Sequence, residues 1–338
     1  MGTDASLEKG KIQPDIRFNT GFASLWTDLM EHPEKGEELI DRIITHRGFF
    51  YLTKNRTSPE KLKEKLVRYL KRRGGYPDFD RKERAKAAKY RQMINFLDKK
   101  GDGIILNALK QAEKFLPEPI HSSLSVWAVT GGDFNARGGY GNEDIALNLD
   151  WFYGKGFWSE FKLTSILTHE FHHVGFKKLI PEHVKRENLM TVLDDVNKGT
   201  RRTNVKDLAK AAIMMNLIGE GYADYAAFIN GEHWDEEYHK NIDGISDHLA
   251  NVKKSLNMLN KVTAENLVSV IKNVKKDMFG GNGPRSGYYA GYWMVRHIAE
   301  SFGQDPIFKV ARKGDFRGFV ELYNQTSVPE SMKLILAD

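Results

Sequence analysis

The chain has 338 residues and contains no cysteine. This absence excludes a disulfide framework and a thiolate metal site, so histidine, aspartate or glutamate would have to bind any metal ion. No apolar run reaches the roughly 18 residues that a membrane-spanning helix needs. Residues 1–17 are polar and lack the apolar core of a signal peptide. We therefore expect no membrane span, whereas a cytoplasmic and an extracytoplasmic location both stay open, as does the oligomeric state.

Two familiar catalytic motifs are also missing. The chain has no Gly-x-Ser-x-Gly, the sequence around the nucleophile of many serine hydrolases, and no phosphate-binding P-loop. The composition is otherwise ordinary, with 41% apolar and 28% charged residues, so the chain can form a large core without covalent cross-links. Composition alone thus indicates a globular protein of one large or two smaller domains.

Positive charge is concentrated in one stretch. The formal net charge is +6, yet Lys54 to Arg91 alone holds 15 Lys and Arg against 5 Asp and Glu. The solvated surface of long helices is the simpler explanation, and an anionic partner such as nucleic acid is the alternative. No nucleic-acid-binding motif and no aromatic stripe accompany the charge, so we do not expect nucleic acid to be the partner.

Apolar residues recur at helical spacing from residue 22 to about residue 116. One helix is predicted over Lys61–Arg72, where two glycines and a proline follow it. Two further helices are predicted over Arg81–Asp98 and Ile104–Phe115.

The apolar period then changes to two. Alternation in residues 124–130 and 144–151 predicts two strands. The segment between them, Gly131 to Gly141, is rich in glycine and contains Asn135, so it should form a loop or a wide hairpin. The second half of the chain returns to helical spacing, and the fold class expected is therefore α+β, mostly helical, with a small antiparallel sheet.

Three helices of this second half are important for the chemistry. Ser159 can cap a helix that runs to about Lys178, and Asn204 can begin another that ends near Gly231. Of three or four further helices, one is predicted over Tyr288–Phe302.

The first of these helices contains the sequence His169-Glu170-Phe171-His172-His173. His169 and His173 are four residues apart, so a helix places both imidazoles on one face, where they can share a tetrahedral zinc ion. Glu170 would lie beside the open coordination position and could take a proton from the metal-bound water. His172 is a competing ligand, because a pair three residues apart could also bind a metal.

A catalytic zinc ion needs a third protein ligand, and Glu220 on the second helix is the best candidate. Asp224 follows one helical turn later and could accept the second N–H of His169, which would fix the orientation of that ring. Glycines flank Glu220, and we expect them to let its helix approach the His169 helix closely. The simpler alternative is that both acids are ordinary surface carboxylates.

HExxH on one helix followed by Glu-x-x-x-Asp on a second resembles the gluzincin metallopeptidases, of which thermolysin is the familiar example. The resemblance implies that His169, His173 and Glu220 bind zinc, that Glu170 is the general base, and that Asp224 supports a ligand. The gap between His173 and Glu220 is longer than in thermolysin, so a segment around 181–203 must fit between the two helices.

The wider pattern is similar to uncharacterised bacterial families described as zinc-dependent peptidases. Their outline is a helical region, a Leu-Pro break (here Leu116-Pro117), a strand pair, HExxH, and then Glu-Gly-x-Ala beginning at Glu220. This resemblance implies a helical region at 1–118, a zincin-like catalytic core at 119–235, and a helical region at 236–338 that completes the cleft.

Gluzincins also place a tyrosine or histidine against the oxyanion that forms during hydrolysis. Gly287-Tyr288-Tyr289-Ala290-Gly291-Tyr292 resembles the Tyr-x-x-Gly pattern of several such enzymes. The resemblance implies Tyr288 as the first choice and Tyr292 as the second, with His297 and Arg296 as weaker candidates. Aromatic residues on a helix are, alternatively, ordinary core residues.

Peptidases of this class bind the substrate as an extra strand on a sheet edge, which the strands before His169 could supply. We therefore expect a zinc peptidase acting on a peptide or protein, with endopeptidase and exopeptidase action both open. One alternative is hydrolysis of another amide or ester. The other is a basic interaction or nucleic-acid-binding protein with a vestigial metal site.

Overall fold

The computed structural model divides the chain into two compact units. One comprises Met1–Lys110 and Ile120–Phe171, and the other comprises Gln111–Pro119 and His172–Asp338. In the described part of the chain helices predominate and a small four-stranded sheet accompanies them, which confirms the α+β class. No described helix combines the length and apolar composition that crossing a membrane requires. The residues described are 17–53, 60–61, 63–64, 67, 81–121, 123–130, 136–140, 144–155, 159–185, 204–228, 242–263, 265–280 and 285–335.

The sheet of the first unit has four strands in the order β1-β2-β4-β3. β1 and β4 pair in parallel with β2, and β3 pairs antiparallel with β4. The two predicted strands, β2 and β4, are thus parallel neighbours rather than a hairpin, and the expected glycine-rich loop contains β3. The strands are β1 (Arg17–Asn19), β2 (Ser125–Val129), β3 (Ala136–Tyr140) and β4 (Asp144–Asn148).

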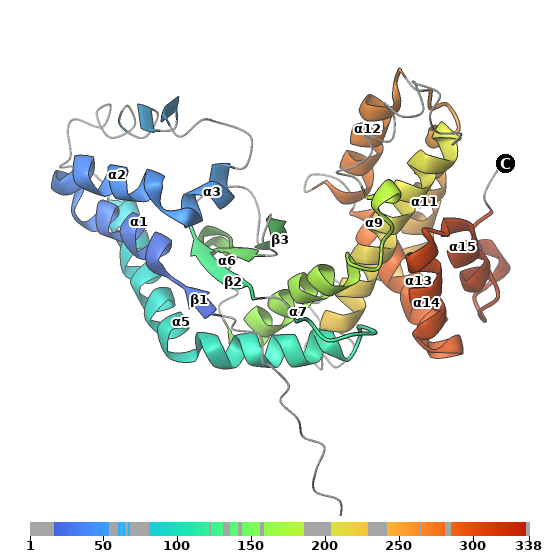
Figure 1. The fold of residues 1–338 in the computed structure, drawn as a ribbon, viewed down its shortest axis with the longest axis horizontal. Helices are drawn as coiled ribbons and strands as arrows, with labels where there is room; N and C mark the ends of the chain where they lie inside the picture. Colours follow the sequence, from blue (N-terminus) through green and yellow to red (C-terminus); the bar gives the residue numbers. More distant parts are fainter. Residues whose placement is uncertain are drawn as a thin grey trace, which may run out of the picture. The chain divides into compact units, whose positions relative to one another are not determined.

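Three helices of the first unit pack together on one face of this sheet (Figure 1). They are α1 (Gly21–Glu31), α2 (Gly36–Thr45) and α3 (Arg47–Thr53). The apolar faces of these helices cover one face of β2 and β4. This removes apolar surface from water and so stabilises the sheet. The shared core consists of Phe22, Leu25, Leu29, Leu39, Ile40, Ile43, Phe49, Trp127, Val129 and Ala146.

α5 (Arg81–Glu113) is one continuous helix where the sequence predicts two. Gly101 and Gly103 interrupt the apolar pattern without ending the helix. A Cβ atom at Gly101 would lie 3.1 Å from the Phe18 ring, so this glycine makes room for the first strand. A Cβ atom at Gly103 would have no neighbour within 4 Å. The helix expected over Lys61–Arg72 is described only at 60–61, 63–64 and 67, all of which are helical.

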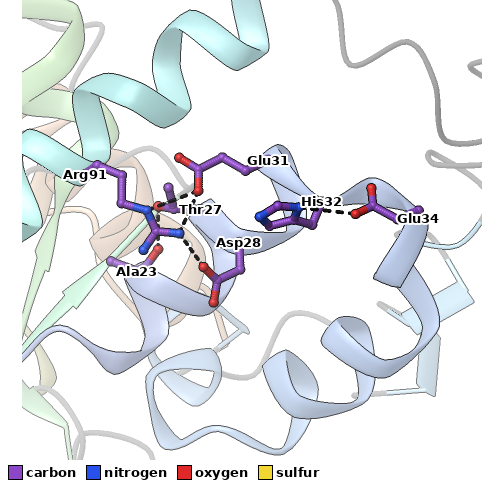
Figure 2. Close-up of polar contacts among 7 residues, drawn as sticks. All are labelled: Ala23, Thr27, Asp28, Glu31, His32, Glu34 and Arg91. Atoms are coloured by element: carbon purple, nitrogen blue, oxygen red, sulfur yellow. Dashed lines mark hydrogen bonds and ion pairs between the residues drawn. The ribbon is translucent and has the colours of Figure 1, made fainter.

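Figure 2 shows how the last cation of the basic stretch is used within the fold. The Arg91 guanidinium of α5 donates to the Glu31 carboxylate of α1 at 2.8 and 3.1 Å, and also to Asp28. The bond to Glu31 raises the pKa of Arg91. Lys63 similarly pairs with Asp41 of α2. These two cations therefore stabilise contacts within the protein, while most of the stretch from Lys54 lies outside the described residues.

α9 (Val205–Phe228) is the central helix of the second unit and is buried along most of its length. α7 (Glu160–Phe176) runs through the boundary between the units as one uninterrupted helix. The remaining helices are α6 (Leu149–Lys155) in the first unit and α11 (Ile245–Leu259), α12 (Leu267–Phe279), α13 (Ser286–Phe302), α14 (Asp305–Lys313) and α15 (Phe316–Asn324) in the second (Figure 1).

The predicted starts of α7 and α9 are confirmed by their capping contacts. The backbone N–H of Lys162 donates to the Ser159 hydroxyl at 3.2 Å, and that of Lys206 donates to the Asn204 side chain at 2.9 Å. Each bond satisfies one of the N–H groups that the first turn of a helix leaves without a partner.

α9 and α13 meet backbone to backbone at a pair of glycines. A Cβ atom at Gly221 would lie 2.1 Å from the carbonyl carbon of Gly291, and one at Gly291 would lie 2.4 Å from the Leu217 oxygen. Gly219, in contrast, has an ordinary 3.8 Å spacing to Phe176 of α7. The expectation that both glycines serve the approach to α7 is therefore wrong for Gly221, whose close neighbour is α13.

Polar and steric contacts fix the start of α13. The His248 ring of α11 lies 3.1 Å from the buried Ser286 hydroxyl, which also accepts from Asn251 at 3.3 Å. Burial lowers the pKa of His248, which favours the neutral ring. A Cβ atom at Gly287 would lie 2.2 Å from the Phe279 ring of α12. The first turn of α13 is thus set by both helices beside it.

Replacing Gly291 by alanine should lower the free energy of unfolding by about 1–3 kcal/mol, because the added methyl group would force α9 and α13 apart. Chemical denaturation of the metal-free protein measures the change. Gly103→Ala is the matched control on an open helix surface, and it should be neutral or stabilising by up to about 1 kcal/mol. Equal stability of Gly291→Ala and the unaltered protein would contradict the close backbone contact.

Candidate metal centre

Three of the predicted ligands lie together. The ligand atoms of His169, His173 and Glu220 all fall within 4.8 Å of one another, and they form the one such group found among the described residues. His169 and His173 occupy successive turns of α7, whose continuity fixes their separation. His173 Nε2 lies 3.1 Å from the Glu220 Oε2 atom on α9. α7 and α9 thus bring two imidazoles and one carboxylate to a single point.

This set of donors fits a zinc ion. Zinc binds imidazole nitrogen and carboxylate oxygen at about 2.0–2.2 Å, and a tetrahedron with such bonds separates its ligand atoms by about 3.4 Å. The 3.1 Å between His173 and Glu220 lies just below this value, and the 4.8 Å limit for the whole group lies above it, so small side-chain shifts would accommodate a metal. The side chains of His173 and Glu220 are 27% and 21% exposed, so water or a small ligand could reach the group. Three protein donors leave one position for such a ligand, as catalytic zinc sites require.

Glu170 lies beside the outer strand of the sheet. Its side chain is 7% exposed. Its Oε2 atom would be 3.1 Å from a Cβ atom at Gly138 in β3. The carboxylate therefore lies close to where the side chain of any other residue at position 138 would begin. β3 is the outer strand of the sheet as far as the structure describes it, so the Glu170 carboxylate lies beside an edge of the sheet.

His172 belongs to the core and lies outside the ligand group. Its ring is fully buried, stacks on Phe176 at 5.4 Å and meets the edge of Tyr222 at 4.7 Å. Its Nε2–H donates to the Phe115 carbonyl oxygen at 3.2 Å. These contacts commit the ring to packing, which leaves His173 as the partner of His169.

Asp224 lies one helical turn beyond Glu220 and is only 6% exposed. The alternative that it is a plain surface acid is therefore excluded. Its predicted bond to His169 stays a prediction.

The two candidate tyrosines of α13 have different surroundings. The half-buried Tyr288 ring has the Arg285 guanidinium 4.4 Å from its centre, with Phe279 edge-on at 5.7 Å. Arg285 has φ 50°, which makes it the one non-glycine residue with positive φ in the described part of the chain. Such strain often accompanies a functional requirement. Tyr288 is thus held between a cation and an aromatic ring at the start of the helix.

Tyr292 is 2% exposed and packs its ring on Tyr225 of α9, 6.1 Å away. Burial raises the pKa of its hydroxyl, and a side-chain hydrogen bond with Arg296 opposes that rise. Tyr225 lies five residues after Glu220 and so about 140° around α9. Tyr292 therefore packs against a different face of α9 from the one that carries Glu220.

The weaker candidates on α13 are also engaged elsewhere. Arg296 pairs with Glu300 at 2.7 Å, and the His297 ring lies 4.4 Å from the Trp293 ring. Burial lowers the pKa of His297.

Sequence reasoning missed Gly138 beside Glu170, and it did not predict that Gly291 meets Gly221. The available signal was the pair of glycines in Ala136-Arg137-Gly138-Gly139-Tyr140. In a strand, glycine often marks a bulge or a close approach of another group.

The comparison with protein families agrees with the ligand group. The family model described as "Putative zinc dependent peptidase (DUF5700)" matches residues 41–327. No curated protein and no solved structure matches the chain. Since the family match covers most of the 338 residues, the chain belongs to this family, whose description names zinc dependence and peptidase activity.

Proposed function

We propose that the chain is a zinc peptidase that hydrolyses peptide bonds with Glu170 as the general base. The observation that carries the proposal is the group of His169, His173 and Glu220, because two imidazoles and one carboxylate are the ligand set of a catalytic rather than a structural zinc site. Glu170 adjoins one of these ligands in the chain and is otherwise buried beside the edge strand. A purely structural zinc ion would have no use for it.

The chemistry requires a water molecule to attack the carbonyl carbon and a proton to reach the amine. When bound, zinc would lower the pKa of such a water molecule to near neutrality and polarise the carbonyl group. The Glu170 carboxylate would accept a proton from the water as the new carbon–oxygen bond forms. It would then deliver that proton to the amine nitrogen as the carbon–nitrogen bond breaks.

β3 offers the place for an extended peptide. It is the outer strand of the sheet, and β4 pairs with only one of its edges in the described part of the chain. An antiparallel strand added at the other edge would lie beside Glu170. This placement replaces the expectation that β2 or β4 supplies the free edge, because both of those strands have neighbours on two sides.

Two further residues complete the proposed machinery. Asp224 would accept the second N–H of His169, as carboxylates commonly do beside metal-bound histidine. Its burial one turn from Glu220 supports that role. Tyr288 would donate its hydroxyl to the oxyanion. Its support is the Arg285 cation beside its ring and the firm placement of the first turn of α13.

Hydrolysis of another amide or ester would use the same residues. The family description favours a peptide. The reading as a basic interaction protein has less support, because Arg91 and Lys63 are paired with acids of α1 and α2.

The protein should bind one zinc ion per chain, measurable by elemental analysis and by competition with a chelating dye. His173→Ala should weaken zinc binding by more than the roughly 10–100-fold that loss of a supporting carboxylate costs, whereas Asp224→Asn should fall within that range. His121→Ala, at an exposed histidine outside the ligand group, is the control. Unchanged zinc affinity in His173→Ala would show that the ligands are misassigned.

Glu170→Gln should retain zinc and lose at least about a hundredfold in kcat, because the amide cannot accept the proton. Cleavage of a fluorogenic peptide library, followed by kinetics on the best substrate, measures the loss. Glu330→Gln, an exposed acid in the second unit, should be as active as the unaltered protein. A fully active Glu170→Gln would rule out the proposed mechanism.

Tyr288→Phe should lower kcat by about 10²–10³-fold, the range for loss of an oxyanion donor, with KM little changed. Tyr292→Phe removes the bond to Arg296 and should cost about 1 kcal/mol of stability while kcat is retained. Steady-state kinetics and denaturation of the two variants separate the roles. The opposite pattern would move the oxyanion assignment to Tyr292.

A further inference from the structure

The edge strand contains a bulge at its two glycines. Ala136 and Arg137 pair with Leu147 and Ala146 in one register, whereas Tyr140 pairs with Asp144 in a register shifted by one residue. Gly138 and Gly139 therefore include an extra residue in β3 that has no counterpart in β4. Bulges of this kind locally redirect a strand and are frequent next to active sites.

Gly138 faces Glu170 across this bulge. A Cβ atom at Gly138 would lie 3.1 Å from Glu170 Oε2 and 3.6 Å from the Glu170 backbone oxygen. Its next contact, Ile145 on β4, is at an ordinary 3.8 Å. The only tight neighbour of this position is therefore the carboxylate of the proposed base.

Space rather than backbone conformation explains the glycine. Among the described residues, the glycines with positive φ are Gly303 and Gly314 alone, so Gly138 has a backbone that other residues can adopt. The methyl group of an alanine there would contact the Glu170 carboxylate. α7, which carries Glu170, is firmly packed and cannot easily move away. Leu167 and Phe171 of α7 are fully buried, and the Thr168 hydroxyl donates to the Ala108 carbonyl oxygen at 3.3 Å.

We infer that Gly138 is a positioning residue for catalysis, whose missing side chain sets where the Glu170 carboxylate lies. This inference rests on the proposed function, since it takes Glu170 as the general base. The bulge brings bare backbone against the carboxylate, so the edge strand that would bind the peptide also places the group that moves the proton. The distance between base and scissile bond is thereby fixed by a single contact.

Gly138→Ala should bind zinc like the unaltered protein, with KM changed less than kcat and kcat lowered by about tenfold or more, because small displacements of a reacting group are costly. Gly103→Ala is the matched control and should leave both constants unchanged. Glu170→Asp, which shortens the side chain by one methylene, should relieve the clash. The double variant Gly138→Ala/Glu170→Asp should therefore lose less activity than the product of the two single losses.

A second cycle, on stability, does not depend on activity. Gly138→Ala should destabilise the metal-free protein, and Gly138→Ala/Glu170→Ala should recover that loss, because the carboxylate that meets the new methyl group is gone. Denaturation of these variants and of Glu170→Ala measures the recovery. This cycle tests the inference even if Gly138→Ala folds poorly. In that case the double variant Gly138→Ala/Glu170→Ala should fold again.

The inference is overturned if Gly138→Ala keeps the kcat of the unaltered protein, or if the two substitutions are independent in both cycles. Failure of the proposed function looks different. In that case Glu170→Gln itself would be active, whereas an inactive Glu170→Gln beside a fully active Gly138→Ala refutes the role of Gly138 alone.

Discussion

The backbone contact between Gly221 and Gly291 is the constraint on which the arrangement of the second unit depends. Helices separated by ordinary side chains lie about 8–10 Å apart, and a glycine pair lets two of them come closer. Here the contact adjoins Glu220 directly in the chain, so it fixes the height and rotation of the carboxylate that meets His173. Tyr222, two residues after Glu220, packs on His172 of α7. α9 therefore contributes both a candidate metal ligand and core packing to its contact with α7.

Local chemistry explains what the sequence predicts well. The starts of α7 and α9 follow from Ser159 and Asn204, whose side chains cap the first turns. The pairing of His169 with His173 follows from helical periodicity alone. Glu220 was recognisable because its spacing from Asp224 repeats a known pattern on a second helix. In each case the information lies within a few residues of the position it concerns.

Contacts between distant segments explain what the sequence does not predict. The sequence predicts a loop at β3, because an edge strand is held by backbone bonds to its neighbour and needs no apolar alternation. The space that Gly101 leaves in α5 is occupied by Phe18, which is far away in the chain. The partner of Gly221 is similarly a residue of another helix. The roles proposed for Asp224 and Tyr288 rest on resemblance. These residues lie on different helices, α9 and α13, and the sequence does not show how those helices pack.

The edge of β3 that would admit a peptide would equally admit a strand from another copy of the protein. Open edges of this kind promote self-association and aggregation, and proteins protect them with charges and irregular pairing. β3 has both features, since Arg137 is exposed and the glycine bulge shifts the register in the middle of the strand. A regular, flat partner strand could pair with only part of such an edge. The irregularity beside Glu170 would thus also help to keep the protein dispersed at high concentration.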